Sequence, residues 1–135
     1  MFRTKKRTIV AALAAALALP ASAAVAGEIS GSRLTFSIAT SGSAEDGNRW
    51  NGPASGHAKP CGDVPASQPN TFSAYIYEDK SFLPDPKIAS TSRAYSQAYG
   101  CGSYKNTNRG GKYYTKATWS GIPGSRANGY VSAQN

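Results

Sequence analysis

The residues best suited to chemistry gather in one stretch, GCGSYKNTNRGGKYYTK, at positions 100–116. It places cationic side chains beside tyrosines, and the candidate binding residues are Tyr104, Lys105, Arg109, Lys112, Tyr114 and Lys116. Lysine and arginine supply charge-assisted hydrogen bonds, and tyrosine supplies rigid contact area with an apolar ring and a polar hydroxyl. This combination predicts a binding surface for a cell-wall polymer, an acidic glycan or a protein.

Catalytic chemistry is poorly supported by the same sequence. The chain has one histidine, His57, and seven acidic residues, among them the adjacent pairs Glu45-Asp46 and Glu78-Asp79. In an extended chain, neighbouring side chains face opposite ways and do not form a general acid and base across a substrate. No nucleophile elbow, HExxH pair, phosphate loop or calcium loop occurs. We therefore expect a protein that is not an enzyme and that needs no cofactor.

Cys61 and Cys101 are the only cysteines, and we expect them to form a disulfide. In the chain-entropy model, a bridge between positions 40 apart contributes about 4 kcal/mol to stability. The alternative is a metal site, because His57 and Cys61 have i, i+4 spacing. Two ligands do not complete a site, so no metal is expected.

The first 26 residues have the order of a secretory signal peptide: cationic start, apolar run, and a small-residue cleavage site. They hold four of the 15 basic residues and none of the acids, so residues 27–135 keep 109 residues and a net charge of +4. This predicts one secreted, extracellular domain with no membrane span. The charge is too small to predict nucleic acid as a partner.

Four segments alternate apolar and polar residues with a period of two, which is typical of strands with one buried face. They are residues 31–42, 71–79, 88–100 and 112–121. No segment has sustained helical periodicity. The expected fold is therefore all-β, a small antiparallel β-sandwich or barrel-like domain with one disulfide.

The remaining segments are rich in Gly, Pro, Ser and Asn. Residues 43–70 are expected to form a long irregular crossing that Cys61 pins, with Trp50 either plugging the core edge or forming an exposed stacking platform. Asn128-Gly129 predicts a tight turn. Residues 130–134 are then expected to form a short edge strand.

Residues 102–111 are expected to form the loop of a hairpin between the third and fourth alternating segments, since their glycines permit positive φ. In the fourth segment, the uncharged set ending in Trp119 is the better candidate for the core. Lys112, Tyr114 and Lys116 should then lie together on an exposed face beside the loop.

Two other functions fit this arrangement. The disulfide-anchored loop 102–111 could be the bait of a secreted protease inhibitor, with Lys105 or Arg109 entering an acidic pocket, because a preorganised loop loses less entropy on binding. A secreted antibacterial toxin, or a subunit of an extracellular assembly, is also consistent with the net positive charge.

Overall fold

The computed structural model describes residues 27–64, 72–93, 99–121 and 123–135; the predicted signal peptide lies outside these ranges. The described chain is all strand and loop. Its strands are β1 (Leu34–Ala39), β2 (Ser41–Glu45), β3 (Trp50–Asn51), β4 (His57–Asp63), β5 (Phe72–Glu78), β6 (Lys87–Arg93), β7 (Gly100–Cys101), β8 (Lys105–Asn106), β9 (Lys112–Ser120) and β10 (Arg126–Gln134). In the ranges described, no helix is long and apolar enough to cross a membrane.

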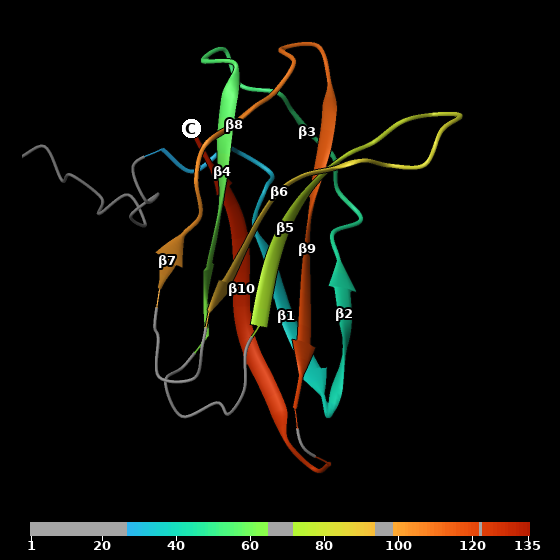
Figure 1. Cartoon of the computed structure of the whole chain (residues 1–135), viewed down its shortest axis with the longest axis vertical. Coiled ribbons are helices and arrows are strands. Elements are labelled where there is room, and N and C mark those ends of the chain that lie inside the picture. Colours follow the sequence, from blue (N-terminus) through green and yellow to red (C-terminus); the bar gives the residue numbers. More distant parts are fainter. Residues whose placement is uncertain (1–26, 65–71, 94–98, 122) are drawn as a thin grey trace, which may run out of the picture.

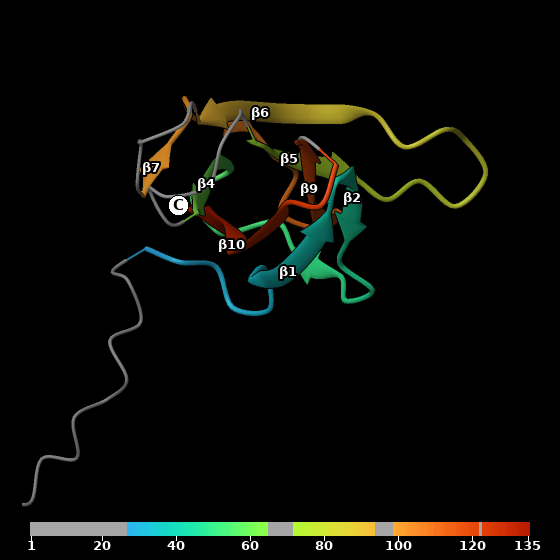
Figure 2. The same ribbon diagram turned by 90° about the horizontal axis from the view of Figure 1, so that it is seen from below.

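The strands form two antiparallel sheets that pack face to face (Figures 1 and 2). The first sheet has the order β1-β10-β4-β7, and β8 pairs with β4 beyond the end of β7. The second has the order β2-β9-β5-β6, and β3 pairs with the start of β9. This arrangement confirms the predicted all-β, sandwich-like fold.

Three of the alternating segments form strands with the predicted buried faces. Phe36 and Ile38 of β1 are buried, and so are alternate residues along β5 and β9: Phe72, Ala74, Ile76, Tyr113, Thr115, Ala117 and Trp119. These faces meet between the sheets, where burial of apolar area supplies most of the favourable free energy.

Trp50 is a core residue. Only 2% of its surface is exposed, and its ring stacks on Tyr113 with 5.1 Å between ring centroids. Of the two expectations for Trp50, the core plug is therefore confirmed over the exposed platform.

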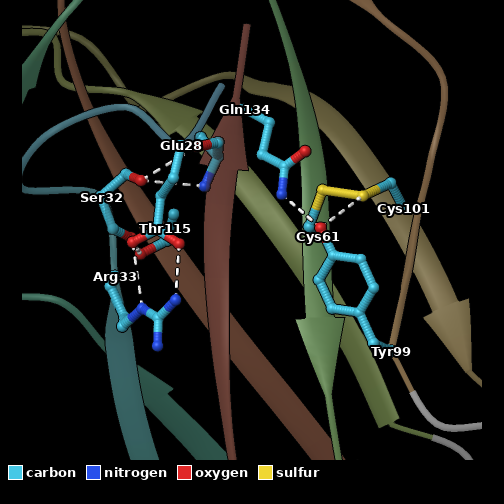
Figure 3. Close-up of polar contacts among 9 residues, drawn as sticks. Glu28, Ser32, Arg33, Cys61, Tyr99, Cys101, Thr115 and Gln134 are labelled. Atoms are coloured by element: carbon cyan, nitrogen blue, oxygen red, sulfur yellow. Dashed lines mark hydrogen bonds and ion pairs between the residues drawn. A yellow bond between two sulfur atoms is a disulfide. The ribbon is translucent and has the colours of Figure 1, made fainter. Parts of the chain in front are cut away.

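The predicted disulfide is present. Cys61 in β4 lies directly opposite Cys101 in β7, with their Cα atoms 4.0 Å apart (Figure 3). Next to it, the Tyr99 hydroxyl lies 3.3 Å from the Cys101 sulfur and accepts a hydrogen bond from the Gln134 amide. Because disulfides persist in oxidising compartments, the bridge is consistent with a location outside the cytoplasm.

Ser32 joins the two sheets through buried hydrogen bonds (Figure 3). Thr115 of β9 donates to the Ser32 carbonyl at 2.8 Å, and the Ser32 hydroxyl contacts both backbone groups of Ala133 in β10. The hydroxyl groups of Ser32 and Thr115 thus have partners inside the sandwich, which avoids the cost of burying them unpaired.

The expectation of an irregular crossing over residues 43–70 is wrong for residues 43–64, which contain part of β2 and all of β3 and β4; residues 65–70 lie outside the described residues. The Pro60 carbonyl in β4 accepts the Gly102 N–H at 2.8 Å. The nitrogen and the carbonyl of a strand residue point to the same side, so the Pro60 nitrogen, which has no hydrogen to donate, faces the gap between β7 and β8. Pro60 is therefore tolerated in this strand. Turn-rich composition misled here, since tertiary pairing determines strands as much as local preference does.

The turn predicted at Asn128-Gly129 is also wrong, and residues 130–134 form the predicted strand but not at a sheet edge. Both belong to β10, which lies in the sheet interior between β1 and β4. A Cβ at Gly129 would lie 2.2 Å from the Asp63 carbonyl oxygen, so glycine is required there for close packing rather than for a turn. The chain reverses earlier, at Gly124, whose φ is +83°.

The hairpin loop at 102–111 is a third correction. The third alternating segment contributes β6 in one sheet and β7 in the other, and its residues 94–98 lie outside the described residues. In the second sheet β6 pairs with β5, whereas β9 pairs with β2, β3 and β5. Residues 102–111 therefore cross from one sheet to the other, and they contribute β8 on the way.

Candidate functional site

The six predicted binding residues do not form one surface. Tyr104 precedes β8, is 48% exposed, and packs between the edge of the His57 ring at 4.7 Å and the Lys59 amino group at 4.7 Å. Arg109 lies in the crossing segment and donates to the Ala54 carbonyl at 3.2 Å. These contacts belong to the β4 and β8 side of the molecule.

Lys112, Tyr114 and Lys116 share the outer face of β9, as the alternation predicts, but Tyr114 is not exposed. Only 5% of its surface is accessible, because the Arg49 guanidinium lies 4.1 Å from its ring centroid and the Asp85 carboxylate accepts its hydroxyl hydrogen at 2.9 Å. Burial and then this bond to Asp85 raise the pKa of Tyr114. The expectation that Tyr114 offers a free ring is therefore corrected.

Two tyrosines of β5 extend the same face. Tyr77 lies opposite Tyr114, and their rings stack with centroids 5.5 Å apart; Tyr75 lies opposite Lys116. Lysines cover these rings, with Lys116 at 5.7 Å from the Tyr77 centroid and Lys87 at 5.4 Å from the Tyr75 centroid. We call Tyr75, Tyr77, Lys87 and Lys116 the tyrosine face.

Hydroxyl groups surround Tyr75. Thr118 donates to its phenol oxygen at 3.4 Å, and Ser73 and Ser92 bond to each other at 2.9 Å on the same side of the sheet. The bonds from Thr118 and Ser73 lower the pKa of Tyr75, because they favour the charged phenolate. This part of the face can exchange hydrogen bonds with a polyhydroxylated ligand.

A polar hollow of about 290 Å³ continues from the tyrosine face around the edge strand β6. Its lining residues, which include no acidic side chain, are Lys87, Ile88, Ala89, Ser90, Ser103 and Lys105. Lys87 belongs to both regions, and Ser90 lies opposite Tyr75 in the sheet. We call this feature the lysine hollow. Two lysines line it: Lys105, which the sequence predicted as a binding residue, and Lys87, which it did not.

The lysine hollow combines two amino groups with two hydroxyl groups. Both lysines are exposed residues. In the described chain, no carboxylate lies within ion-pair distance of either amino group. Such a site can hold an anionic group through charge-assisted hydrogen bonds. Among residues 27–64, 72–93, 99–121 and 123–135, no cluster of three His, Cys, Asp or Glu residues could hold a metal ion.

Part of this site carried a signal in the sequence. The alternation over residues 71–79 already places Tyr75 and Tyr77 on the face opposite the core, as it does for Tyr114 and Lys116. What was missing is the pairing of β5 with β9, which puts the two sets side by side. Lys87 and Lys105 line the same hollow because the segment that carries Ser103 and Lys105 lies beside β6, which no local sequence pattern reveals.

Comparison with protein-family models, curated proteins and solved structures finds no match to this chain.

Proposed function

We propose that this is a secreted, non-enzymatic binding protein that engages an acidic polysaccharide outside the cell. In this proposal, sugar rings pack on Tyr75 and Tyr77, and an acidic substituent enters the lysine hollow between Lys87 and Lys105. The proposal depends on one observation: the tyrosine face and the lysine hollow form a continuous surface through Lys87.

The chemistry of each part favours an acidic glycan over the other partners. Tyrosine provides rigid amphipathic contact area and loses little entropy when a ligand binds. Lysines without carboxylate partners attract anions, and the serine hydroxyls can accept or donate hydrogen bonds to sugar hydroxyls. A flat protein partner would use the tyrosine face but has no particular need for a recessed pair of amino groups.

The test is affinity electrophoresis of the purified protein in gels that contain polygalacturonate, with gels that contain neutral dextran for comparison. We expect retardation only by the acidic polymer, and weaker retardation at higher salt. Lys87→Ala together with Lys105→Ala should weaken binding about tenfold or more, since the loss of two charge-assisted contacts exceeds 1.4 kcal/mol.

Arg33→Ala is the matched control. Arg33 covers a tyrosine ring on the first sheet, 4.1 Å from the Tyr130 centroid, so this variant removes one cation–tyrosine contact away from the proposed site. It should bind polygalacturonate like the parent protein. Equal retardation by dextran, or full binding by the double lysine variant, would contradict the proposed function.

A further inference from the structure

The loop between β5 and β6, residues 79–86, exposes two large apolar side chains at its tip. Phe82 is 98% exposed and Leu83 is 70% exposed. Figures 1 and 2 both show this loop extending well beyond the two sheets. Soluble domains rarely present adjacent apolar side chains so far from any other surface without a binding purpose. We call residues 79–86 the projecting loop.

The projecting loop is held in one conformation by Asp85. One oxygen of its carboxylate accepts the Lys80 N–H at 2.8 Å, and the other accepts the Tyr114 hydroxyl at 2.9 Å. At the base of the loop, the Glu78 N–H donates to the Pro86 carbonyl at 3.1 Å. Pro84 and Pro86 each fix one φ angle. The base that carries the exposed tip is therefore preorganised.

Lysines surround the base of the loop. Lys80 belongs to it, Lys87 follows it, and Lys112 is adjacent because its carbonyl accepts the Asp79 N–H at 2.8 Å. Two of the nearby acids form ion pairs, Glu78 with Lys80 at 2.6 Å and Asp79 with Arg49 at 2.7 Å, while Asp85 accepts hydrogen bonds from the Lys80 N–H and the Tyr114 hydroxyl. In the described part of the chain, Lys87 and Lys112 have no carboxylate within ion-pair distance. The loop thus has an apolar tip above unneutralised lysines.

We propose that the projecting loop binds an anionic lipid bilayer. Phe82 and Leu83 enter the boundary between headgroups and acyl chains, while Lys87 and Lys112 contact acidic headgroups. Stable attachment to a membrane surface requires both an apolar and a basic contribution, and this loop supplies the two together. A lipid surface is favoured over a protein pocket because the loop projects from the sheets, and two lysines without a carboxylate partner in the described chain, Lys87 and Lys112, lie at its base and suit a negatively charged plane.

Co-sedimentation with vesicles tests the proposal. Vesicles of phosphatidylcholine with phosphatidylglycerol should bind the protein, and vesicles of phosphatidylcholine alone should bind it at least about tenfold less. Phe82→Ser with Leu83→Ser should weaken binding to the mixed vesicles by about tenfold or more. Ser81→Ala, in the same loop, is the matched control and should bind normally. Binding that survives the double serine variant would overturn the proposal.

A tryptophan substitution reports directly on insertion. Trp50 and Trp119 are only 2% and 3% exposed, so they respond little to lipid. In Phe82→Trp, the added indole is solvent-exposed, and its emission should shift to the blue when mixed vesicles are added. An unchanged emission spectrum, or no binding to any vesicle, would overturn the proposal. The tip would then be expected to bind in a pocket of a partner protein.

Asp85→Ala separates preorganisation from composition. This variant keeps Phe82, Leu83 and the lysines but loses both carboxylate bonds that hold the loop. We expect several-fold weaker vesicle binding, because ordering the loop then opposes insertion. The variant with Phe82→Ser and Leu83→Ser keeps every residue of the tyrosine face and the lysine hollow and should bind polygalacturonate normally, so failure of this proposal and failure of the proposed glycan binding are distinguishable.

Discussion

The outer face of the β2-β9-β5-β6 sheet has two regions with the same residue types and different partners. We call the first, which comprises Arg49, Asp79, Asp85 and Tyr114, the anchored region. Its Arg49 guanidinium lies 4.1 Å from the Tyr114 ring centroid. Asp79 accepts a hydrogen bond from Arg49 at 2.7 Å, and Asp85 accepts one from the Tyr114 hydroxyl at 2.9 Å. The tyrosine face also pairs cations with tyrosine rings, but at 5.4 and 5.7 Å. There the nearest carboxylate, that of Glu45, lies 3.9 Å from Lys116.

The difference shows how carboxylates decide the role of a cation–tyrosine cluster. Where acids complete the hydrogen bonds, the cluster is packed and supports the projecting loop. In the tyrosine face, Glu45 reaches only Lys116, and hydroxyl groups surround Tyr75, so Lys87 and the tyrosine hydroxyls keep unused binding capacity, which is the condition for recognising a ligand. Residue type alone does not distinguish the two regions.

The largest expected effect comes from shortening one tyrosine in each region. Tyr114→Ala should lower the free energy of unfolding by about 3 kcal/mol, because it empties a buried site and removes one of the two hydrogen-bond donors to Asp85. Tyr77→Ala should cost about 1 kcal/mol, since Tyr77 is half-buried. Urea denaturation measures both. Equal losses would mean that the two regions are packed alike.

Replacing the cations should separate stability from binding. Arg49→Ala should cost about 1 kcal/mol of unfolding free energy and leave polygalacturonate affinity unchanged, because Arg49 already has acidic partners. Lys87→Ala should change stability by less than about 0.5 kcal/mol and weaken binding several-fold. Denaturation and affinity electrophoresis on the same two proteins would show this reversal. Parallel behaviour would remove the distinction.

Some strands of this protein were predictable from the sequence, and their neighbours in the sheets were not. Alternation identified β1, β5 and β9 and the residues that they bury, since a period of two follows directly from strand geometry. The same period says which face a residue occupies but not which strand lies beside it. It therefore missed that β9 lies between β2 and β5 and that β10 is an interior strand.

The binding residues show the same limit. Tyr114 was correctly placed on the outer face of β9, but its burial depends on Arg49 and Asp85, which come from segments 65 and 29 positions away. Lys105 was predicted as a binding residue because of its charge. Lys87, which lines the same hollow, directly follows a proline-rich break and was not predicted. Contacts between distant loops form only once the sheets are assembled, so no short window of sequence contains them.

The stability of the protein at alkaline pH should reflect the anchored region. Because the pKa of Tyr114 is raised in the folded state, its contribution is complete below the ordinary tyrosine pKa of about 10 and declines as the pH rises above that value. The pKa of Tyr75 is lowered, so ionisation of Tyr75 opposes this decline. Tyr114→Phe should make the loss of stability above pH about 10 shallower. An unchanged slope would exclude Tyr114 as its source.

The smallest expected effect concerns the hydroxyl beside Tyr75. Thr118→Val keeps the shape of the side chain and removes its hydrogen bond to the Tyr75 phenol, so the pKa of Tyr75 should rise toward its ordinary value. Stability should change by less than about 0.5 kcal/mol. Asp85→Asn is the counterpart in the anchored region and should lower the pKa of Tyr114, because the acceptor loses its charge. Phenolate absorbance during alkaline titration would detect both shifts. The Thr118 hydroxyl donates to Tyr75 and favours its phenolate, whereas the Asp85 carboxylate opposes the phenolate of Tyr114. If the pKa values of Tyr75 and Tyr114 shifted in the same direction in these two variants, the two regions would not differ as described.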